Sequence, residues 1–186
     1  MMDRKRSSTH DLERYARLFA ERSVKVKTSA MRDMMSITDR PEVISLATGM
    51  PDTQSFPKDL LESVFVDMAR HHSAELLQYT PTDGIAPVKQ RITEVMAAEG
   101  VTADIDNLLV TTGGQQAIDL ITRVLVDPGD TIITEAPTYP GAVPSFLSFQ
   151  AEAVQIDIDN DGLRIDLLEL ELDRLERAGI VPKFIY

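Results

Sequence analysis

The sequence has no cysteine, no tryptophan and no long apolar run. Without cysteine, the chain has no disulfide, no thiolate nucleophile and no cysteine-ligated metal. A membrane-spanning helix needs about 20 predominantly apolar residues, and no stretch of this chain approaches that length. The basic N-terminus is followed by no apolar segment, which is not typical of a secretory signal. These absences predict a soluble, cytoplasmic chain without a membrane partner.

Positive charge is also in short supply. The 19 Lys and Arg residues stand against 30 Asp and Glu residues, which leaves a formal net charge of −11. Nucleic-acid phosphates need a basic face on the protein, so the excess of acid predicts no nucleic-acid partner. The three histidines lie in polar stretches and predict no metal site. At 43% apolar residues, a chain of 186 residues can bury a core, and its length suggests about one domain or slightly more.

Strand-like and helical segments alternate from residue 107 onward. Strands are predicted at 107–112, 131–135 and 151–159, and residues 183–186 resemble the start of another. Helices are predicted between them, and the last of these is expected to begin with Asp166 as its cap and to end at Gly179. Such alternation indicates right-handed βαβ crossovers and a mostly parallel sheet with helices on both faces. The predicted fold class is therefore α/β, a three-layer sandwich with an N-terminal helical arm.

The first part of the chain lacks this alternation. Helices are predicted over 11–23 and 28–38, a third near Pro57 and a fourth near Pro87, because proline is favoured in the first turn of a helix. Residues 1–50 are therefore assigned to an arm with short helices, and 51–186 to the sheet domain. A strand pattern that stops at Tyr186 suggests the front part of a longer protein; the alternative is a short edge strand.

Apolar spacing predicts which side chains these helices bury. The expected inward residues are Leu60, Leu61, Val64, Phe65 and Met68 in the helix near Pro57; Val88, Ile92, Val95 and Met96 in the helix near Pro87; Ala117, Ile118, Ile121, Val124 and Leu125 in the helix over 113–126; and Leu168, Leu172 and Leu175 in the last helix.

The strongest local signal is the segment LLVTTGGQQAIDLI, residues 108–121. A predicted strand leads into Gly113 and Gly114 and directly into a helix. Glycines let the backbone turn tightly and let a ligand approach without Cβ interference. Unpaired N–H groups and the helix dipole favour an anion at such a corner. We therefore predict an anion site there; the alternative is a Gly-Gly bend for close helix–strand packing.

Two tyrosines lie in loops that can belong to the same site. Tyr139, within EAPTYPGA, follows the next predicted strand and can cover a flat ligand face; the alternative is an aromatic plug in the core. Tyr79, within LLQYTPTDGIAP, can donate its O–H to an anion; the alternative is a surface loop tyrosine.

Together these motifs resemble the fold type I pyridoxal-phosphate enzymes, the class I/II aminotransferases. Within them, the chain is most similar to the 2-aminoadipate and kynurenine-type subgroup and to regulators that carry an aminotransferase-like domain. The match is carried by VISLATGMPD, LLQYTPTDGIAPVKQRI, the segment 108–142 and the closing VPKFIY. It runs from about residue 24 to 186. The resemblance implies that residues 51–186 are the N-terminal part of a cofactor-binding large domain, truncated at Tyr186.

The resemblance also implies roles for individual residues around the cofactor, pyridoxal 5'-phosphate. Gly113, Gly114 and Gln115 match the phosphate cradle, and Tyr139 matches the aromatic residue stacked on the ring. Tyr79 matches a tyrosine that reaches the phosphate in the neighbouring subunit, which implies a homodimer. Many relatives carry serine where this chain has Gly114, a change that removes a hydroxyl but keeps the backbone amides.

Two further matches concern the substrates, an amino acid and a 2-oxo acid. Gly49 matches a backbone contact to the substrate carboxylate, although ATGMP stands where relatives often carry a Gly-Gly pair. Arg32 matches a position that can bind an acidic substrate side chain; the alternative is a solvated charge on a helix. Which amino donor is used does not follow from these residues.

The family's covalent anchor is not among these residues. The lysine that forms the Schiff base with the cofactor, and the carboxylate that keeps its pyridine nitrogen protonated, follow the position of Tyr186 in the family. None of the chain's lysines has the family's Ser-Lys setting (Lys5, Lys25, Lys27, Lys58, Lys89 and Lys183). The resemblance thus implies an N-terminal fragment of an aminotransferase that is inactive alone. The alternatives are a cofactor-binding sensor domain of a transcription regulator and a non-catalytic truncated product.

Overall fold

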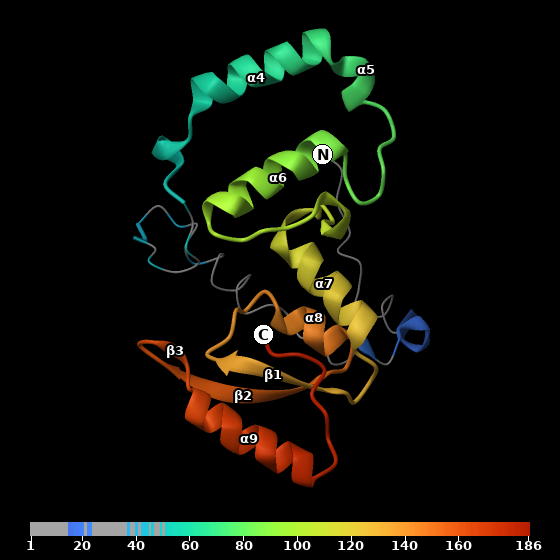
Figure 1. The fold of residues 1–186 in the computed structure, drawn as a ribbon, viewed down its shortest axis with the longest axis vertical. Helices are drawn as coiled ribbons and strands as arrows, with labels where there is room; N and C mark the ends of the chain where they lie inside the picture. The colour runs from blue at the N-terminus through green and yellow to red at the C-terminus, as the bar shows by residue number, and fades with distance from the viewer. Residues whose placement is uncertain are drawn as a thin grey trace, which may run out of the picture. The chain divides into compact units, whose positions relative to one another are not determined.

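The computed structural model describes residues 15–20, 22–23, 37, 40, 42–44, 46, 49 and 51–186. The chain forms two compact units, one of Arg40–Thr112 and one of Gly113–Tyr186 together with Met1–Asp39, of which only part is described (Figure 1). The predicted domain boundary near residue 50 stays a prediction. The 3-10 turn η1, Ala16–Leu18, falls within the helix predicted over 11–23; most of the helix predicted over 28–38 lies outside the described residues.

A small mixed sheet forms the centre of the second unit. Strand β1, Thr131–Ala136, pairs in parallel with β2, Glu152–Asp159, with Thr131 opposite Glu152 and Ala136 opposite Asp157. The short β3, Gly162–Leu163, turns back antiparallel on β2. The parallel β1–β2 pair confirms the predicted crossover between 131 and 159.

The end of the chain pairs with the other side of β1. Ile185 forms a parallel bridge with Ile133, and the Ile133 amide donates to the Phe184 carbonyl at 3.0 Å. The rings of Phe184 and Tyr186, two residues apart, both lie near Phe146, with centroids at 6.0 and 5.3 Å. Because alternate residues of a strand point to one face, this arrangement confirms the strand start predicted at 183–186. It makes β1 the central strand.

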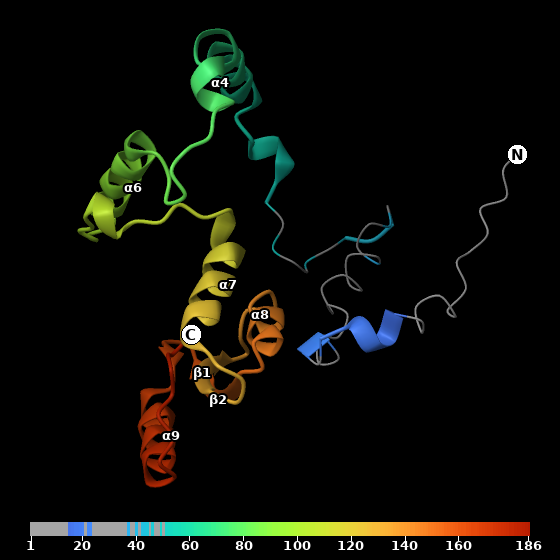
Figure 2. The same ribbon diagram turned by 90° about the vertical axis from the view of Figure 1, so that its right-hand side faces the viewer.

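Helices cover both faces of this sheet (Figure 2). Neighbouring residues of β1 point to opposite faces. Ile132 packs with Val126, Ala142 and Phe146 on the side of α7, Gly113–Leu125, and α8, Val143–Ser148. Ile133 packs with Ile156, Leu168 and Leu175 on the side of α9, Ile165–Arg177. The three-layer α/β class predicted from the sequence is confirmed.

The last helix follows its predicted pattern, apart from its cap. Leu168 and Leu175 are buried and Leu172 is packed against them, and Gly179, at φ +70°, follows the helix end. Asp166 is not the cap, however: Arg164 is the N-cap residue, and Asp166 lies in the first turn. There its carboxylate accepts a hydrogen bond from Arg164 Nε at 2.7 Å. The positive end of the helix dipole stabilises its negative charge.

Two predictions near α7 are wrong. Residues 107–112 form no strand, because the Val110 amide donates to the Asp83 carbonyl of a loop at 3.0 Å instead of to a neighbouring strand. In α7, Ile121 and Val124 are 53% and 79% exposed, whereas Thr122 is fully buried. The helix has two apolar stripes, and only the stripe with Ile118 packs against the described core.

The unit Arg40–Thr112 is helical in its described part. Asp52 caps the 3-10 turn η2, Thr53–Ser55, and α4, Lys58–His71, α5, Ser73–Leu76, α6, Ala86–Ala98, and the 3-10 turn η3, Ile105–Asn107, follow. The helices predicted near Pro57 and Pro87 are thereby confirmed.

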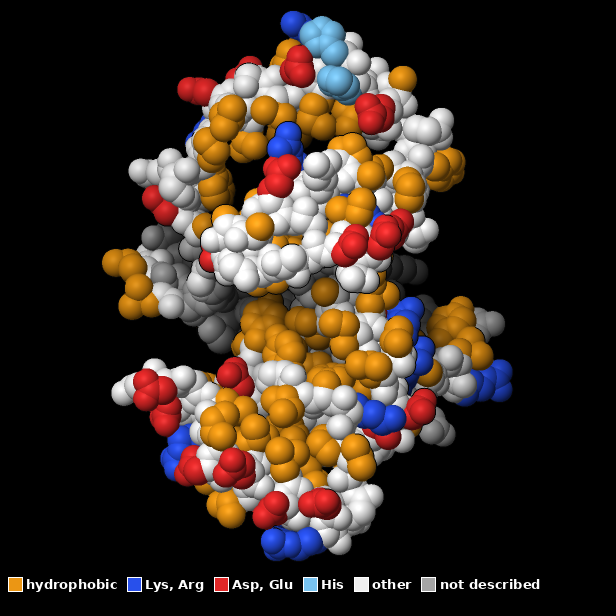
Figure 3. Space-filling model, in the orientation of Figure 1, with side chains coloured by type: hydrophobic (Ala, Val, Ile, Leu, Met, Phe, Trp, Pro, Cys, Tyr) orange, Lys and Arg blue, Asp and Glu red, His pale blue; other side chains and the backbone are white. Residues whose placement is uncertain are grey.

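The burial predicted for α4 and α6 is wrong for most of the predicted residues, of which only Met68, Ile92 and Met96 are partly buried. Helix α4 has no buried residue, and hydrophobic side chains such as Leu60 and Phe65 are exposed at its surface (Figure 3). On α6, Val88 and Val95 are exposed, and the buried side chain is Lys89. Apolar spacing marks the face that a helix can bury, but a second surface must be present to bury it, and the described residues supply none over α4.

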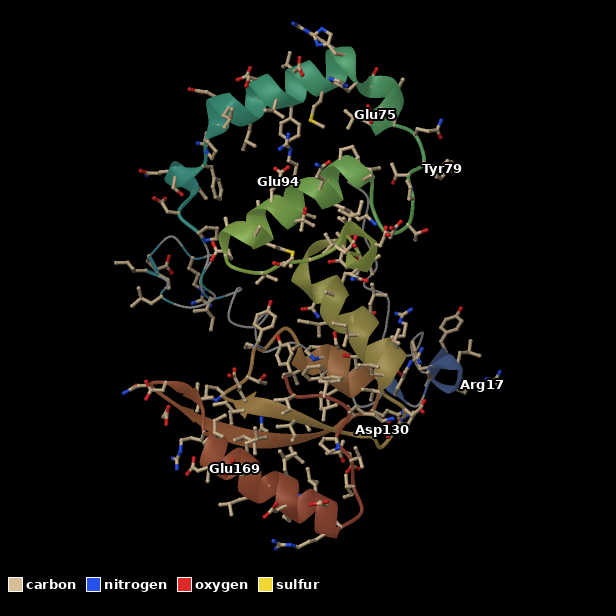
Figure 4. The ribbon with its side chains drawn as sticks, in the orientation of Figure 1. Arg17, Glu75, Tyr79, Glu94, Asp130 and Glu169 are labelled. Carbon is tan, nitrogen blue, oxygen red and sulfur yellow. The ribbon has the colours of Figure 1, made fainter. Side chains whose placement is uncertain are left out.

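The turn before β1 yields a pH-dependent prediction. The Asp130 carboxylate accepts a hydrogen bond from the Asp127 amide at 2.7 Å and lies 3.2 Å from Lys183 Nζ (Figure 4). These contacts, the amide bond first, hold the pKa of Asp130 below its usual value of 3.8. A lowered folded-state pKa contributes stability above the unfolded pKa, and this contribution is lost as pH falls through the folded pKa.

We therefore expect Asp130→Asn to lower the melting temperature at pH 7, and this deficit to shrink below about pH 4 as Asp130 of the parent chain becomes protonated. Thermal unfolding followed by circular dichroism between pH 2 and pH 7 measures both curves. Asp106→Asn, which removes the same charge from η3, is the control and should leave the pH profile parallel to that of the parent chain. A deficit for Asp130→Asn that is constant with pH would contradict the assignment.

Candidate functional site

The predicted anion corner and Tyr139 lie at the same edge of the sheet. Strand β1 ends at Ala136, and the loop that follows carries Tyr139 and leads into α8. The Gln115 side-chain amide in the first turn of α7 donates to Ser145 Oγ in α8 at 3.0 Å. The beginnings of α7 and α8 therefore lie together near the carboxyl end of β1, where ligands of parallel sheets bind.

The corner itself is open. Gly113 has φ +72°, a left-handed conformation that favours glycine, and it begins the 13-residue helix α7. A Cβ atom placed on Gly113 or on Gly114 would meet no atom within 4 Å. No described side chain plugs the corner, and the positive end of the helix dipole is directed at it. The predicted anion site is therefore sterically accessible.

Tyr139 is half-exposed, and Gly141 determines where its ring can lie. Tyr139 is 50% exposed, which does not fit an aromatic plug in the core. A Cβ on Gly141 would lie 2.5 Å from Tyr139 Cε1 and 2.7 Å from its Oη. Only a residue without a side chain allows the ring to rest there. Gly141 was not predicted as a site residue, although the Tyr-Pro-Gly order contained the signal.

Two more polar residues at this edge were not predicted. Ser145 is buried at 6% exposure and accepts the Gln115 hydrogen bond. A serine within the otherwise apolar turn VPSF was the available signal. The Thr138 hydroxyl, next to Tyr139, is buried and has no hydrogen-bond partner among the described residues. Buried hydroxyls are usually paired, so Thr138 can serve a bound polar group.

These features fit a ligand that is anionic at one end and flat at the other. The glycine corner can receive the anion, Tyr139 offers an aromatic face, and Thr138 offers a hydroxyl. Of the residues that the resemblance assigns to cofactor binding, Gln115 contacts α8 through Ser145, and Tyr139 lies in the loop that leads into α8; their role in cofactor binding stays a prediction.

The remaining predicted residues lie elsewhere in the chain. Tyr79 and Gly49 belong to the unit Arg40–Thr112; the Tyr79 side chain is 99% exposed, and Gly49 has φ +60°. Arg32 lies outside the described residues. The roles predicted for these three residues stay predictions.

Lys183, the one lysine of the segment 113–186, does not supply an anchor at the corner. The Lys183 amide donates to the Thr131 carbonyl at the amino end of β1, and its Nζ lies 3.2 Å from Asp130, so Lys183 sits at the opposite edge of the sheet. Lys89 is paired with Asp83. In the part of the chain that the structure describes, no cluster of three potential metal ligands occurs. No described helix combines the length and apolarity needed to cross a membrane.

The fold is α/β, with an open glycine corner at the carboxyl edge of a parallel strand pair. Residues 41–186 match the family model described as aminotransferase class I and II. The chain therefore belongs to the class I and II aminotransferase family.

Relatives and solved structures agree with this family. The chain is 36% identical to the aromatic-amino-acid aminotransferase 1 of Thermococcus litoralis over 96% of its length and 42% of that protein. It is 31% identical to the 2-aminoadipate transaminase of Thermus thermophilus, over 92% of this chain and 41% of that protein. The kynurenine aminotransferase of Pyrococcus horikoshii, solved in complex with PMP, matches with a TM-score of 0.86 and 31% identity, over 95% of this chain and 44% of that chain. The chain thus spans about two fifths of the length of the proteins it matches.

Proposed function

We propose that this chain contributes the phosphate cradle and the ring-covering aromatic residue of a pyridoxal-5'-phosphate-dependent aminotransferase. The complete protein would transfer an amino group between an amino acid and a 2-oxo acid. The observation that carries the proposal is the open glycine corner at the start of α7, beside a half-exposed Tyr139. Membership of the aminotransferase family supports the same function.

Each residue of the site has a defined task in this function. Gly113 and Gly114 let the phosphate approach the backbone at the positive end of α7, where the helix dipole stabilises its charge. Tyr139 covers one face of the ring, and Gly141 leaves room for it. The Thr138 hydroxyl donates to a polar group of the bound cofactor or substrate. When bound, the cofactor supplies the electron sink for the reaction, and the residues of this chain hold and orient it.

Further parts of the proposal rest on the resemblance. Tyr79 would donate to the phosphate bound by the neighbouring subunit of a homodimer, and its full exposure leaves it accessible for this. Gly49 would contact the substrate carboxylate through its backbone, and Arg32 would bind an acidic side chain of the substrate. We propose that the protein is cytoplasmic and that it acts in amino acid metabolism, in a biosynthetic process.

These 186 residues alone would not catalyse the transfer. The reaction needs a lysine that holds the cofactor covalently, and Lys183 lies at the sheet edge away from the corner. We propose that binding through the phosphate, rather than through a covalent bond, is what this part of the fold contributes.

The test compares cofactor binding by Gly114→Asp and Gly114→Ser. A carboxylate at the corner repels the phosphate and removes charge-assisted hydrogen bonds, which should weaken pyridoxal 5'-phosphate binding roughly 100-fold. Binding of pyridoxal, which has no phosphate, should not change. The helix dipole stabilises an aspartate in the first turn, so the variant should fold as stably as the parent chain. Fluorescence titration measures both ligands.

Gly114→Ser is the matched control and should bind pyridoxal 5'-phosphate as well as the parent chain, because its Cβ meets no atom within 4 Å. Equal loss of both ligands in Gly114→Asp, or no loss of either, would overturn the phosphate cradle. Conversion of the cofactor to its amino form by a panel of amino donors distinguishes the enzyme from a sensor domain, which would bind the cofactor without transferring the amino group.

A further inference from the structure

Lys89 is the one charged side chain that is buried among the described residues. It lies on α6 at 6% exposure, and its Nζ is 2.6 Å from Asp83 Oδ2. Asp83 itself is about half-exposed, and this hydrogen bond holds its pKa below the usual value. Burying an ammonium group is costly unless it is paired, and a well-packed apolar side chain would stabilise the same place equally well. The pair therefore calls for a role other than stability.

The pair fixes one particular turn. The Asp83 carbonyl accepts a hydrogen bond from the Val110 amide at 3.0 Å, and the Gly84 amide donates to the Pro81 carbonyl at 3.1 Å. Gly84 has φ +102°, and a Cβ there would overlap the Val110 side chain. The turn is thus held by α6 through Lys89 and by the segment before α7 through Val110. We refer to Asp83, Gly84, Lys89 and Val110 as the latch.

Tyr79 lies close to the latch in the sequence. It lies in the connection between α5 and α6, two residues before Pro81, and its side chain points away from that connection (Figure 4). The Tyr79 side chain is 99% exposed, so packing does not hold it. Its amide donates a local hydrogen bond to the side-chain oxygen of Gln78 at 2.9 Å. The nearest fixed point after Tyr79 is the turn that Lys89 anchors.

We propose that Lys89 is a positioning residue, which through Asp83 and the 81–84 turn sets the place from which the Tyr79 hydroxyl binds the cofactor phosphate. The inference rests on the proposed function. An alternative is that the Lys89–Asp83 pair only stabilises the unit Arg40–Thr112, in which case its loss would not distinguish a phosphorylated ligand from an unphosphorylated one.

The test is a double-mutant cycle on Lys89 and Tyr79 in the protein, with pyridoxal 5'-phosphate and pyridoxal as paired ligands. Lys89→Met replaces the buried ammonium with an apolar side chain of similar length and returns Asp83 to water. We expect it to weaken pyridoxal 5'-phosphate binding about tenfold, the factor of one lost hydrogen bond to a charged group. Tyr79→Phe should cause a loss of the same order. The double variant should bind no more weakly than Tyr79→Phe alone, because the effect of Lys89 passes through Tyr79.

Two further variants control the cycle. Lys89→Arg keeps the charge and the donors and should restore binding to within about threefold of the parent chain. Arg91→Met removes another cation of α6, one that is 80% exposed on its side chain and pairs with Glu94 at 2.6 Å, and it should leave both ligands unaffected. Should Lys89→Met fail to fold, Asp83→Ala removes the acceptor of the same bond from the exposed side and should show the same phosphate-dependent loss.

The outcomes separate the two proposals. If the parent chain does not bind pyridoxal 5'-phosphate more tightly than pyridoxal, the proposed function fails. If it does, and Tyr79→Phe weakens binding while the Lys89 and Asp83 variants leave it unchanged, the latch has no positioning role. Equal loss of both ligands in Lys89→Met, or additive losses in the double variant, would also overturn the inference.

Discussion

Replacing Gly84 by alanine is expected to lower the free energy of unfolding by about 3–5 kcal/mol, since a strained backbone and an overfilled contact combine at one residue. Gly84 has φ +102°, where an L side chain is strained, and the new methyl group would lie 2.8 Å from Val110 Cβ and closer still to Val110 Cγ2. Neither contact can be relieved cheaply, because the Val110 amide is bonded to the Asp83 carbonyl directly beside it. Chemical denaturation measures the loss.

Gly100→Ala is the matched control for this prediction. Gly100 also has a positive φ, +79°, but a Cβ there meets no atom within 4 Å. It should cost only the strain of the left-handed conformation, about 1 kcal/mol. If the two variants were equally destabilised, the close approach of Gly84 to Val110 would contribute nothing to stability, and Gly84 would not belong to the latch.

Ile133→Ala should be the second severe change, with a loss of about 3–4 kcal/mol, because it leaves a cavity at the centre of the sheet. The Ile133 side chain is fully buried, and it packs with Ile156, Leu168 and Leu175 between β1 and α9. Its backbone bonds to Phe184 and Tyr186 on the final segment. Loss of the side chain therefore loosens α9 from the sheet at the point where the last strand is attached.

The control for Ile133 is Val124→Ala on α7. Val124 is 79% exposed, and truncation of so exposed a side chain should change the free energy of unfolding by less than about 0.5 kcal/mol. Chemical denaturation of both variants, with hydrogen exchange of the α9 amides in Ile133→Ala, measures the difference. A loss for Val124→Ala as large as that for Ile133→Ala would mean that α7 is covered on its second stripe.

The sequence predicted the elements of the sheet unit well, because their signals are local. Aliphatic and β-branched runs mark β1 and β2, and the leucines of α9 repeat at helical spacing before Gly179. The parallel pairing followed from the helix between the strands, because parallel strands need a crossover. The family resemblance and the residues of the corner also came from the sequence, since a glycine pair between a strand-like run and a helix is a short contiguous motif.

The sequence misled where a residue's environment depends on which groups it contacts in the folded chain. Residues 108–112 have the composition of a strand, but strand formation depends on pairing, and Val110 bonds to a loop. Apolar spacing predicted no burial for Lys89, which is buried. It predicted burial for Val88 and Val95 of the same helix, which are exposed. Gly141 and Ser145 became visible as site residues only when the Tyr139 ring and the Gln115 side chain were placed against them.

By itself, the sequence determined the α/β class, the order of most of its strands and helices, and the family resemblance, because each depends on residues adjacent in the chain. The tertiary structure alone decided which apolar faces are covered, which charge is buried and what holds the 81–84 turn in place. These outcomes depend on which side chains meet in the folded chain, and side-chain periodicity does not determine that.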